Sequence, residues 1–291
     1  MQIAELLLLA AIWGASFLFM RIATPEFGPI ALITLRVGIA ALVLLPMLRT
    51  GDARQHLRNK AGPFLIAGIF SSALPFCLFA YSTLHLNAGF DSILNATTPL
   101  WTGVIAFVWL KKTMKRMQVL GLIISLVGVV TLVWGQVEGD IASSLLPILA
   151  VLLATLSYGF SSNYTKQHLA DVPSAVVAAG SQLFATLVLL PLVLFTWPSA
   201  PISPTAWYAA LALGVFCTGV AYFIFFKLIA QKGASYAVSV TFLIPIFGVM
   251  WGAIFLGEKI TLTMIGASLI ILFGTALFTE KLKFSRALQV S

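Results

Sequence analysis

Residues 87–129, NAGFDSILNATTPLWTGVIAFVWLKKTMKRMQVLGLIISLVGV, and residues 233–274, GASYAVSVTFLIPIFGVMWGAIFLGEKITLTMIGASLIILFG, share one pattern. Each stretch is an apolar run of helix length with a proline near its middle, followed by a short charged turn and a second apolar run. Pro99 and Pro245 are 146 positions apart, as are Lys112 and Glu258. A half-length repeat in so apolar a chain indicates a membrane transporter with its binding site between the halves.

The composition excludes an ordinary soluble domain. Hydrophobic residues make up 60% of the chain and charged residues 9%, with a mean hydropathy of +1.04, whereas soluble proteins carry roughly 25% charged residues. Residues 172–226 contain no Asp, Glu, Lys or Arg. The net charge of +8 does not indicate nucleic-acid binding, because the basic residues cluster in short loops between apolar runs. The lipid bilayer is therefore the expected surrounding.

Ten runs are long and apolar enough for membrane-spanning helices, each of which needs about 20 residues. They are residues 3–20, 29–48, 63–82, 87–110, 117–136, 141–166, 173–195, 205–227, 234–256 and 260–279. Short turns rich in Gly, Pro, Asn and Ser separate them. The expected fold is thus an all-α membrane protein of ten transmembrane helices.

The distribution of Lys and Arg sets the expected orientation. Fourteen of these residues fall on the side that holds the amino terminus, two (Arg21 and Lys259) fall on the other side, and Arg36 lies within a span. Cytoplasmic loops of membrane proteins carry the excess of positive charge. We therefore expect both termini in the cytoplasm and a multi-pass protein of the cell inner membrane.

The repeat extends over the whole chain, as residues 1–140 and 141–291. Trp13 and the following Gly-Ala-Ser-Phe match Tyr158 and its successors at an offset of 145. Five spans per copy is an odd number, so the second copy must enter the membrane inverted. Inverted repeats are typical of alternating-access transporters, whose sites lie near the midplane.

These features resemble a known family. The resemblance rests on the W-G-x-S-F pattern at residues 13–17, the mid-helix proline of the fourth span, and F-L-G-E-K at residues 255–259. The chain resembles the ten-helix, EamA-type branch of the drug/metabolite transporter superfamily. Within it, the chain resembles bacterial exporters of aromatic and other amino acids. The resemblance implies outward transport of small metabolites. The chain departs from the family in one respect. The position that matches Glu258 in the first copy is Lys112, whereas EamA-type proteins often have Glu there too.

Two polar features within the spans are candidates for substrate contact. Asn87, Asp91, Asn95, Thr98 and Thr102 would share one face of the fourth helix, either as a substrate path or for hydrogen bonding between helices. Arg36 lies roughly 10 Å inside the second span. It would form an ion pair, for instance with Asp91, reach the outer surface, or bind a substrate carboxylate.

Aromatic and small hydroxyl side chains on several spans suit a pocket for a small amphipathic ligand. The candidate substrate-binding residues are Trp13, Ser16, Phe17, Arg36, Asp91, Asn95, Thr98, Trp101, Tyr158, Ser161, Ser162 and Tyr222. Pro99 and Pro245 are candidate gating residues, because proline bends a helix.

The expected function is export of small metabolites, including aromatic amino acids, by alternating access through a central cavity. Carriers of another metabolite or of drugs are the alternatives within this class, and an intramembrane enzyme is the alternative outside it. The chain has no HExxH or GxSxG motif, so it is not expected to be an enzyme. We expect a small-molecule substrate, no cofactor, no metal site, no nucleic-acid partner and a monomeric state.

Overall fold

The computed structural model describes residues 2–136 and 141–282, and every regular element in this part of the chain is a helix. The elements up to residue 136 are α1 (Gln2–Leu44), η1 (Leu45–Leu48), α2 (Gly51–Asn59), α3 (Ala61–Gly68), η2 (Ile69–Ala73), α4 (Leu74–Ser82), α5 (Ala88–Asn95), α6 (Thr98–Val108) and α7 (Arg116–Gln136). The later elements are α8 (Ile141–His168), α9 (Ser174–Thr196), α10 (Pro204–Gly214), η3 (Val215–Val220), α11 (Ala221–Lys232), α12 (Ala234–Val238), η4 (Ser239–Phe242), α13 (Ile244–Leu256) and α14 (Leu262–Phe278).

The helical segments have the length and composition of membrane spans. Among the described residues, six segments are long and apolar enough to cross a bilayer, and the bent pair of 236–242 and 244–256 would make a seventh. The long segments account for most of the predicted runs, while the apolar α14 has 17 residues. The chain is therefore an all-helical, multi-pass membrane protein.

Helix α1 differs from the expected pair of spans separated by a turn. The structure continues α1 for 43 residues, through Pro25 and Pro29, and breaks it at Gly28 (φ 72°, ψ 161°). Residues with a Cβ rarely adopt this conformation, so glycine allows the break. The expected first span, 3–20, was thus too short, and the change of direction occurs at one residue instead of in a loop.

Two further helical segments break directly before a proline. Helix α5 ends at Asn95 and α6 begins at Thr98, with Pro99 in its first turn. Helix α13 begins at Ile244, immediately before Pro245, after a bend of 41°. Proline lacks the backbone N–H that would continue a preceding helix, whereas the first turn of a new helix tolerates it.

Two short π-helical segments interrupt the other long runs. They are η2 (Ile69–Ala73), between α3 and α4, and η3 (Val215–Val220), between α10 and α11. Their first residues are 146 positions apart, the separation already found for the two prolines. π-helical segments are frequent at functional sites because they release carbonyl groups and re-aim side chains.

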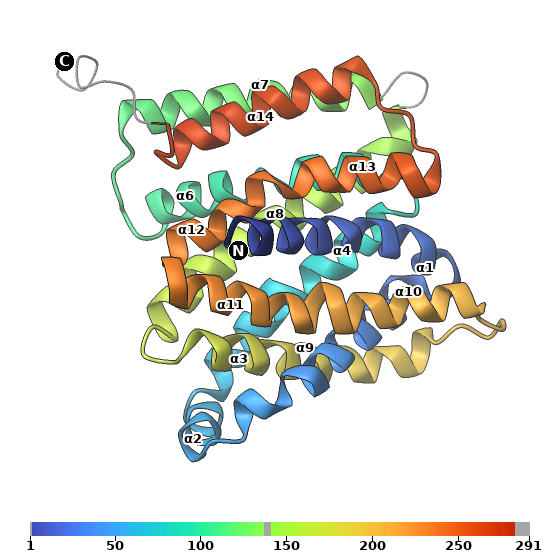
Figure 1. Cartoon of the computed structure of the whole chain (residues 1–291), viewed down its shortest axis with the longest axis vertical. Coiled ribbons are helices and arrows are strands. Elements are labelled where there is room, and N and C mark those ends of the chain that lie inside the picture. Colours follow the sequence, from blue (N-terminus) through green and yellow to red (C-terminus); the bar gives the residue numbers. More distant parts are fainter. Residues whose placement is uncertain (1, 137–140, 283–291) are drawn as a thin grey trace.

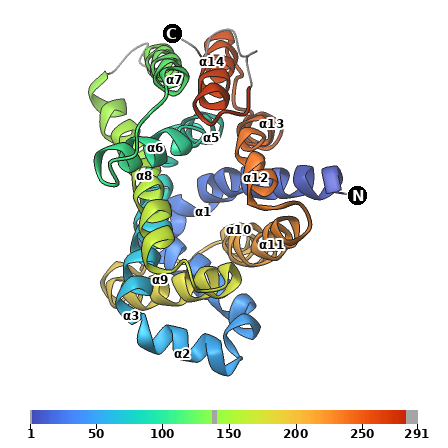
Figure 2. The same ribbon diagram turned by 90° about the vertical axis from the view of Figure 1, so that its left-hand side faces the viewer.

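Helix α1 lies at the centre of the bundle, and α7 and α14 lie side by side at one edge (Figures 1 and 2). The loops after α6, α8 and α11 lie toward the left of Figure 1, and the loops after α9 and α13 lie toward the right. Helix α1 packs against α9, α10 and α13, and α4 packs against α8.

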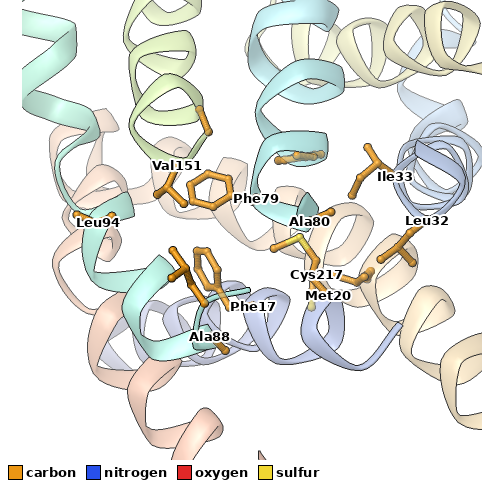
Figure 3. Packing of buried hydrophobic residues seen from close by; sticks show 14 of the residues in the cluster. Phe17, Met20, Leu32, Ile33, Phe79, Ala80, Ala88, Leu94, Val151 and Cys217 are labelled. Carbon is orange, nitrogen blue, oxygen red and sulfur yellow. The ribbon is translucent and has the colours of Figure 1, made fainter. Parts of the chain in front are cut away.

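The buried core extends from α1 into α4, α5 and α8. Figure 3 shows Phe17 beside Phe79, and Met20, Ala80 and Cys217 belong to the same buried cluster. These side chains lie next to the polar groups described below. The core therefore fixes those groups among helices from both ends of the sequence.

Candidate substrate site

The central polar residue is Arg36, whose side chain is 5% exposed. Its Nε donates to Thr218 Oγ1 at 3.0 Å, and its Nη1 lies 3.6 Å from the Met20 sulfur. The guanidinium carbon lies 3.7 Å from the centroid of the Phe76 ring, a cation–π contact. No carboxylate of the described chain forms a salt bridge with Arg36. The structure thus holds a buried cation with donor capacity left over.

The π segment η3 positions the acceptor of Arg36. Thr218 Oγ1 donates to the carbonyl of Leu213 at 2.9 Å and accepts from Arg36. Thr218 lies within η3, and its hydroxyl is held between the Leu213 carbonyl and the guanidinium of Arg36.

A second hydrogen bond occupies the equivalent positions. Gln182 Nε2 donates to Ser72 Oγ at 2.8 Å, and both side chains are buried. Gln182 is 146 positions after Arg36, and Thr218 is 146 positions after Ser72. Each bond therefore joins a helix of one half to the π segment of the other half. Only one of the two equivalent bonds carries a charge.

Aromatic rings surround the Arg36 group. The Phe17 ring packs edge-on against Phe79 at 5.5 Å between centroids. The Tyr158 ring stacks on Phe79 at 6.1 Å and packs edge-on against Phe76 at 6.3 Å. Tyr158 and Tyr222 are also electrostatic neighbours of Arg36. Of the predicted residues, Phe17, Arg36, Tyr158 and Tyr222 thus come together around this centre.

Two buried polar atoms near this centre lack a well-formed hydrogen bond in the described chain. One is the Ser16 hydroxyl, which lies beside the thiol of Cys217. The other is the Gln182 side-chain oxygen, which lies near Tyr222. Unsatisfied buried polar atoms are uncommon in proteins and often mark functional positions.

Asp91 lies apart from this group, so the ion pair with Arg36, one of the three alternatives for that arginine, is not formed among the described residues. The carboxylate is fully buried, and its Oδ1 accepts from the Ser82 hydroxyl at 2.8 Å. Arg36 instead contacts Thr218, Met20 and Phe76. The reason is that α5 packs against α13, and this contact places Asp91 beside the turn that joins α4 to α5.

The remaining predicted residues on α5 and α6 largely satisfy their own polar groups. Thr98 Oγ1 donates to the Asn95 carbonyl, and Thr102 Oγ1 donates to the Thr98 carbonyl. Asn95 is partly buried, and the buried Trp101 Nε1 has no partner in the described residues. The helix break after Asn95 interrupts the expected continuous polar stripe.

Three predicted residues lie at other positions. Ser161 is buried, Ser162 is exposed and donates to the Tyr158 carbonyl, and Trp13 packs against Phe225 at 5.3 Å. Helices α6 and α8 meet closely here, because a Cβ on Gly159 would lie 2.8 Å from the backbone of Trp101. These residues therefore border the central group and do not contact Arg36 through any hydrogen bond of the described chain.

A cavity of about 690 Å³ lies near the ends of α4 and α13. Its lining includes Arg21, Asn87, Glu258 and Lys259. None of the twelve predicted substrate-binding residues lines it. Glu258 accepts from the backbone N–H groups of Ala88 and Gly89 at 2.7 and 3.1 Å, so the acid of the F-L-G-E-K motif caps α5.

The twelve candidate substrate-binding residues did not include five members of the central group, which are Met20, Ser72, Phe76, Gln182 and Thr218. The repeat offset held a usable signal, since it placed Gln182 opposite Arg36 and Thr218 opposite Ser72. The repeat offset gave no comparable indication of the contacts that Met20 and Phe76 make with Arg36.

A multi-pass helical protein that buries an arginine among aromatic rings, with no carboxylate partner in the described chain, has the features of a carrier for a small molecule. The chain belongs to the EamA-like transporter family, whose model matches residues 2–134 and again 145–279.

Relatives cover nearly the whole chain. The chain is 26% identical to "Uncharacterized transporter YvbV" of Bacillus subtilis over 97% of its length and 92% of that protein. It is 24% identical to "Uncharacterized transporter YoaV" of the same organism over 94% of both chains, and 26% identical to "Protein PagO" of Salmonella typhimurium over 82% of this chain and 79% of that one. One crystal structure matches with a TM-score of 0.69 over 99% of both chains at 18% identity, a likeness of fold. The family and the names of these relatives indicate a small-molecule transporter, not an enzyme.

Proposed function

We propose that this protein is a ten-span carrier of the cell inner membrane that exports amino acids, including aromatic ones, by alternating access. The observation that carries the substrate class is Arg36, a buried guanidinium with no carboxylate partner in the described chain. An isolated buried charge is disfavoured by several kcal/mol unless a counter-ion joins it. A substrate carboxylate would supply that counter-ion through paired hydrogen bonds.

The surrounding residues suit the rest of an aromatic amino acid. Phe17, Phe76 and Tyr158 offer ring faces and edges, which favour stacked or edge-on packing with a substrate ring. The unpaired oxygens of Ser16 and Gln182 offer acceptors for an ammonium group. Trp13, Asn95, Thr98, Trp101, Ser161 and Ser162 belong to the proposed path that borders this site.

The matched hydrogen bonds support the inverted repeat of residues 1–140 and 141–291. Gln182 lies 146 positions after Arg36, and Thr218 lies 146 positions after Ser72, so the two hydrogen bonds occupy equivalent positions. An approximate two-fold axis through the site requires this equivalence. On this view the two parts of α1 count as two spans, divided at Gly28, and the broken pairs α5–α6 and α12–α13 each count as one. The total is then ten.

Further features of the proposal rest on the sequence. Cytoplasmic termini follow from the distribution of Lys and Arg. Outward transport follows from the resemblance to amino-acid exporters, and we propose a monomeric state. Pro99 and Pro245, at the breaks of their helices, would serve as gating positions.

Counterflow in proteoliposomes tests the role of Arg36. Vesicles loaded with unlabelled phenylalanine should accumulate labelled phenylalanine when they contain the unaltered protein. Arg36→Gln should raise the concentration needed for half-maximal uptake by about 10- to 100-fold, since a hydrogen bond to a charged group contributes about 1.5–3 kcal/mol. Phenylalaninamide, which lacks the carboxylate, should show little difference between the two proteins.

The matched control is Arg49→Gln, because Arg49 is exposed at the end of η1. This control should leave both substrates unaffected. Equal losses for phenylalanine and phenylalaninamide in Arg36→Gln would contradict carboxylate binding and would favour a drug-like or uncharged substrate. Absence of phenylalanine counterflow in the unaltered protein would contradict the proposed function itself.

A further inference from the structure

Asp91 is one of two described residues, with Glu5, whose carboxyl group has a buried oxygen that lacks a hydrogen-bond partner in the described chain. Its Oδ1 accepts from Ser82, whereas its Oδ2 has no partner in the described chain, and the side chain is 0% exposed. Glu5, in contrast, forms a salt bridge with Lys227. A single hydrogen bond does not offset the desolvation of an ionised carboxylate. The arrangement therefore suits the neutral acid, with its proton on Oδ2.

Two charged groups lie near Asp91 on neighbouring elements, Arg21 on α1 and Glu258 in the turn after α13. Arg21 directs a nitrogen to the Thr83 carbonyl and forms no salt bridge with Asp91 in the described residues.

The other elements around Asp91 add no ionic partner. Helices α13 and α14 contain no titratable residue, and α4 contributes Ser82 as the donor. The remaining titratable groups on the packed helices are Glu5, Glu26 and Arg36 on α1, Cys77 and Tyr81 on α4, and Tyr158, Tyr164, Lys166 and His168 on α8.

Glu258 and Asp91 meet the same turn of one helix. Glu258 accepts from the N–H groups of Ala88 and Gly89, and Asp91 follows within the first turn of α5. The helix N-terminus stabilises one negative charge there. A second charge, on Asp91, would repel Glu258 and weaken its hold on α5, because two close carboxylates do not ionise independently.

Helix α5, which Glu258 caps, packs tightly against α13. A Cβ on Gly89 would lie 3.2 Å from Val249, and a Cβ on Gly248 would lie 2.3 Å from Ser92 Oγ, so α5 and α13 are in close contact. Helices α6 and α12, which continue the same two runs, form no comparable interface (Figure 2). The two runs are thus closed against each other at the α5–α13 end.

We propose that Asp91 is a proton-binding site that controls the α5–α13 gate. While Asp91 holds a proton, Glu258 caps α5 and the gate is closed. Loss of the proton to solvent releases Glu258, which lines the cavity of about 690 Å³, and opens the gate. The reaction breaks one O–H bond of Asp91 and transfers one proton to solvent. The proposal goes beyond the proposed function, on which it depends only for its link to transport.

The test uses a cysteine in place of Val249, in a chain that carries Cys77→Ala and Cys217→Ala. A hydrophilic maleimide is applied to proteoliposomes, and the labelling rate is measured across the neutral range without substrate. Labelling should rise with pH as the gate opens. The same cysteine in an Asp91→Asn chain should show only the smaller rise that thiol ionisation itself causes, and thereby serves as the matched control.

Two further variants make the result decisive even if Asp91→Asn folds poorly. Ser82→Ala removes a donor that stabilises the ionised acid, so the rise in labelling should shift to higher pH. Glu258→Gln should give fast labelling at every pH. Parallel pH profiles for the chains with and without Asp91→Asn, or an unshifted profile for Ser82→Ala, would overturn the proposal. Because no substrate is present, failure of phenylalanine counterflow would not affect this outcome.

Discussion

Arg36 and Gln182 occupy equivalent positions in the two halves but differ in charge. Both donate to a hydroxyl in the π segment of the opposite half, so the geometry is matched and the chemistry is not. An asymmetric pair suits an asymmetric ligand, whose carboxylate would face Arg36. On the proposed inverted repeat, the two equivalent hydrogen bonds therefore differ in the charge that they carry.

Thr218→Val should destabilise the protein by about 1.5–3 kcal/mol, because it leaves the Arg36 Nε–H without its acceptor. The control is Thr186→Val, which removes a hydroxyl that donates only to the Gln182 carbonyl one turn earlier in its own helix. Thermal unfolding of both variants in one detergent, followed by tryptophan fluorescence, measures the difference. Equal shifts in Tm would show that Thr218 does not support the charge.

Polar residues within spans were only partly interpretable from the sequence. Spacing correctly marked Arg36 as buried, and the ring-bearing residues Phe17, Tyr158 and Tyr222 do surround it. Thr98 and Thr102 bond to their own helix, an option that spacing cannot distinguish from a path. The partners of Asp91 and Arg36 depend on packing between distant segments, which no local pattern encodes.

At the scale of elements, the break in α1 depends on Gly28. Gly28→Ala should destabilise the fold by about 1–3 kcal/mol through backbone strain alone, because no atom lies within 4 Å of the added Cβ. Gly62→Ala is the control: its Cβ also meets nothing within 4 Å, and its φ is not positive. Tm values in detergent compare the two. A harmless Gly28→Ala would mean that the helix can bend elsewhere.

Some of the irregular elements could be predicted from the sequence and others could not. Prolines predicted the breaks before Pro99 and Pro245, since they remove a backbone donor at a definite position. The two π segments carry no comparable residue signal, because a π segment depends on the hydrogen bonds that neighbouring helices offer. Gly28 lies between Pro25 and Pro29. The two prolines suggested a loop, whereas the structure continues the helix and breaks it only at Gly28.

At the scale of the whole molecule, the arrangement of loops predicts a definite topology. Reporters fused at Gly51 and Lys115 should be active on the cytoplasmic side, and a reporter fused at Ser199 should be active on the outer side. The loop after α6 and the loop after α9 lie at opposite ends of the bundle in Figure 1, as this result requires. An outer location for Lys115 would contradict the orientation and the inverted repeat together.

The family, the helical class and the membrane location were predictable because they depend on composition and on a repeat that extends through the chain. The number of spans was harder to read, because α1 merges two predicted runs and α14 has only 17 residues. Length alone cannot decide how a bent or short helix crosses a bilayer.

Helices α7 and α14 pack closely through glycine and hydroxyl positions: a Cβ on Gly121 would lie 2.6 Å from the Gly274 carbonyl oxygen, and Ser125 donates to the Ile271 carbonyl at 3.2 Å. Helix α7 is made before α14 during translation. During synthesis, the glycine surface of α7 therefore lacks its partner helix until more than a hundred further residues have been inserted into the membrane. Helix α14 thus completes the packing of the first half as well as that of the second, and a ribosome that stops before residue 262 leaves both halves unfinished.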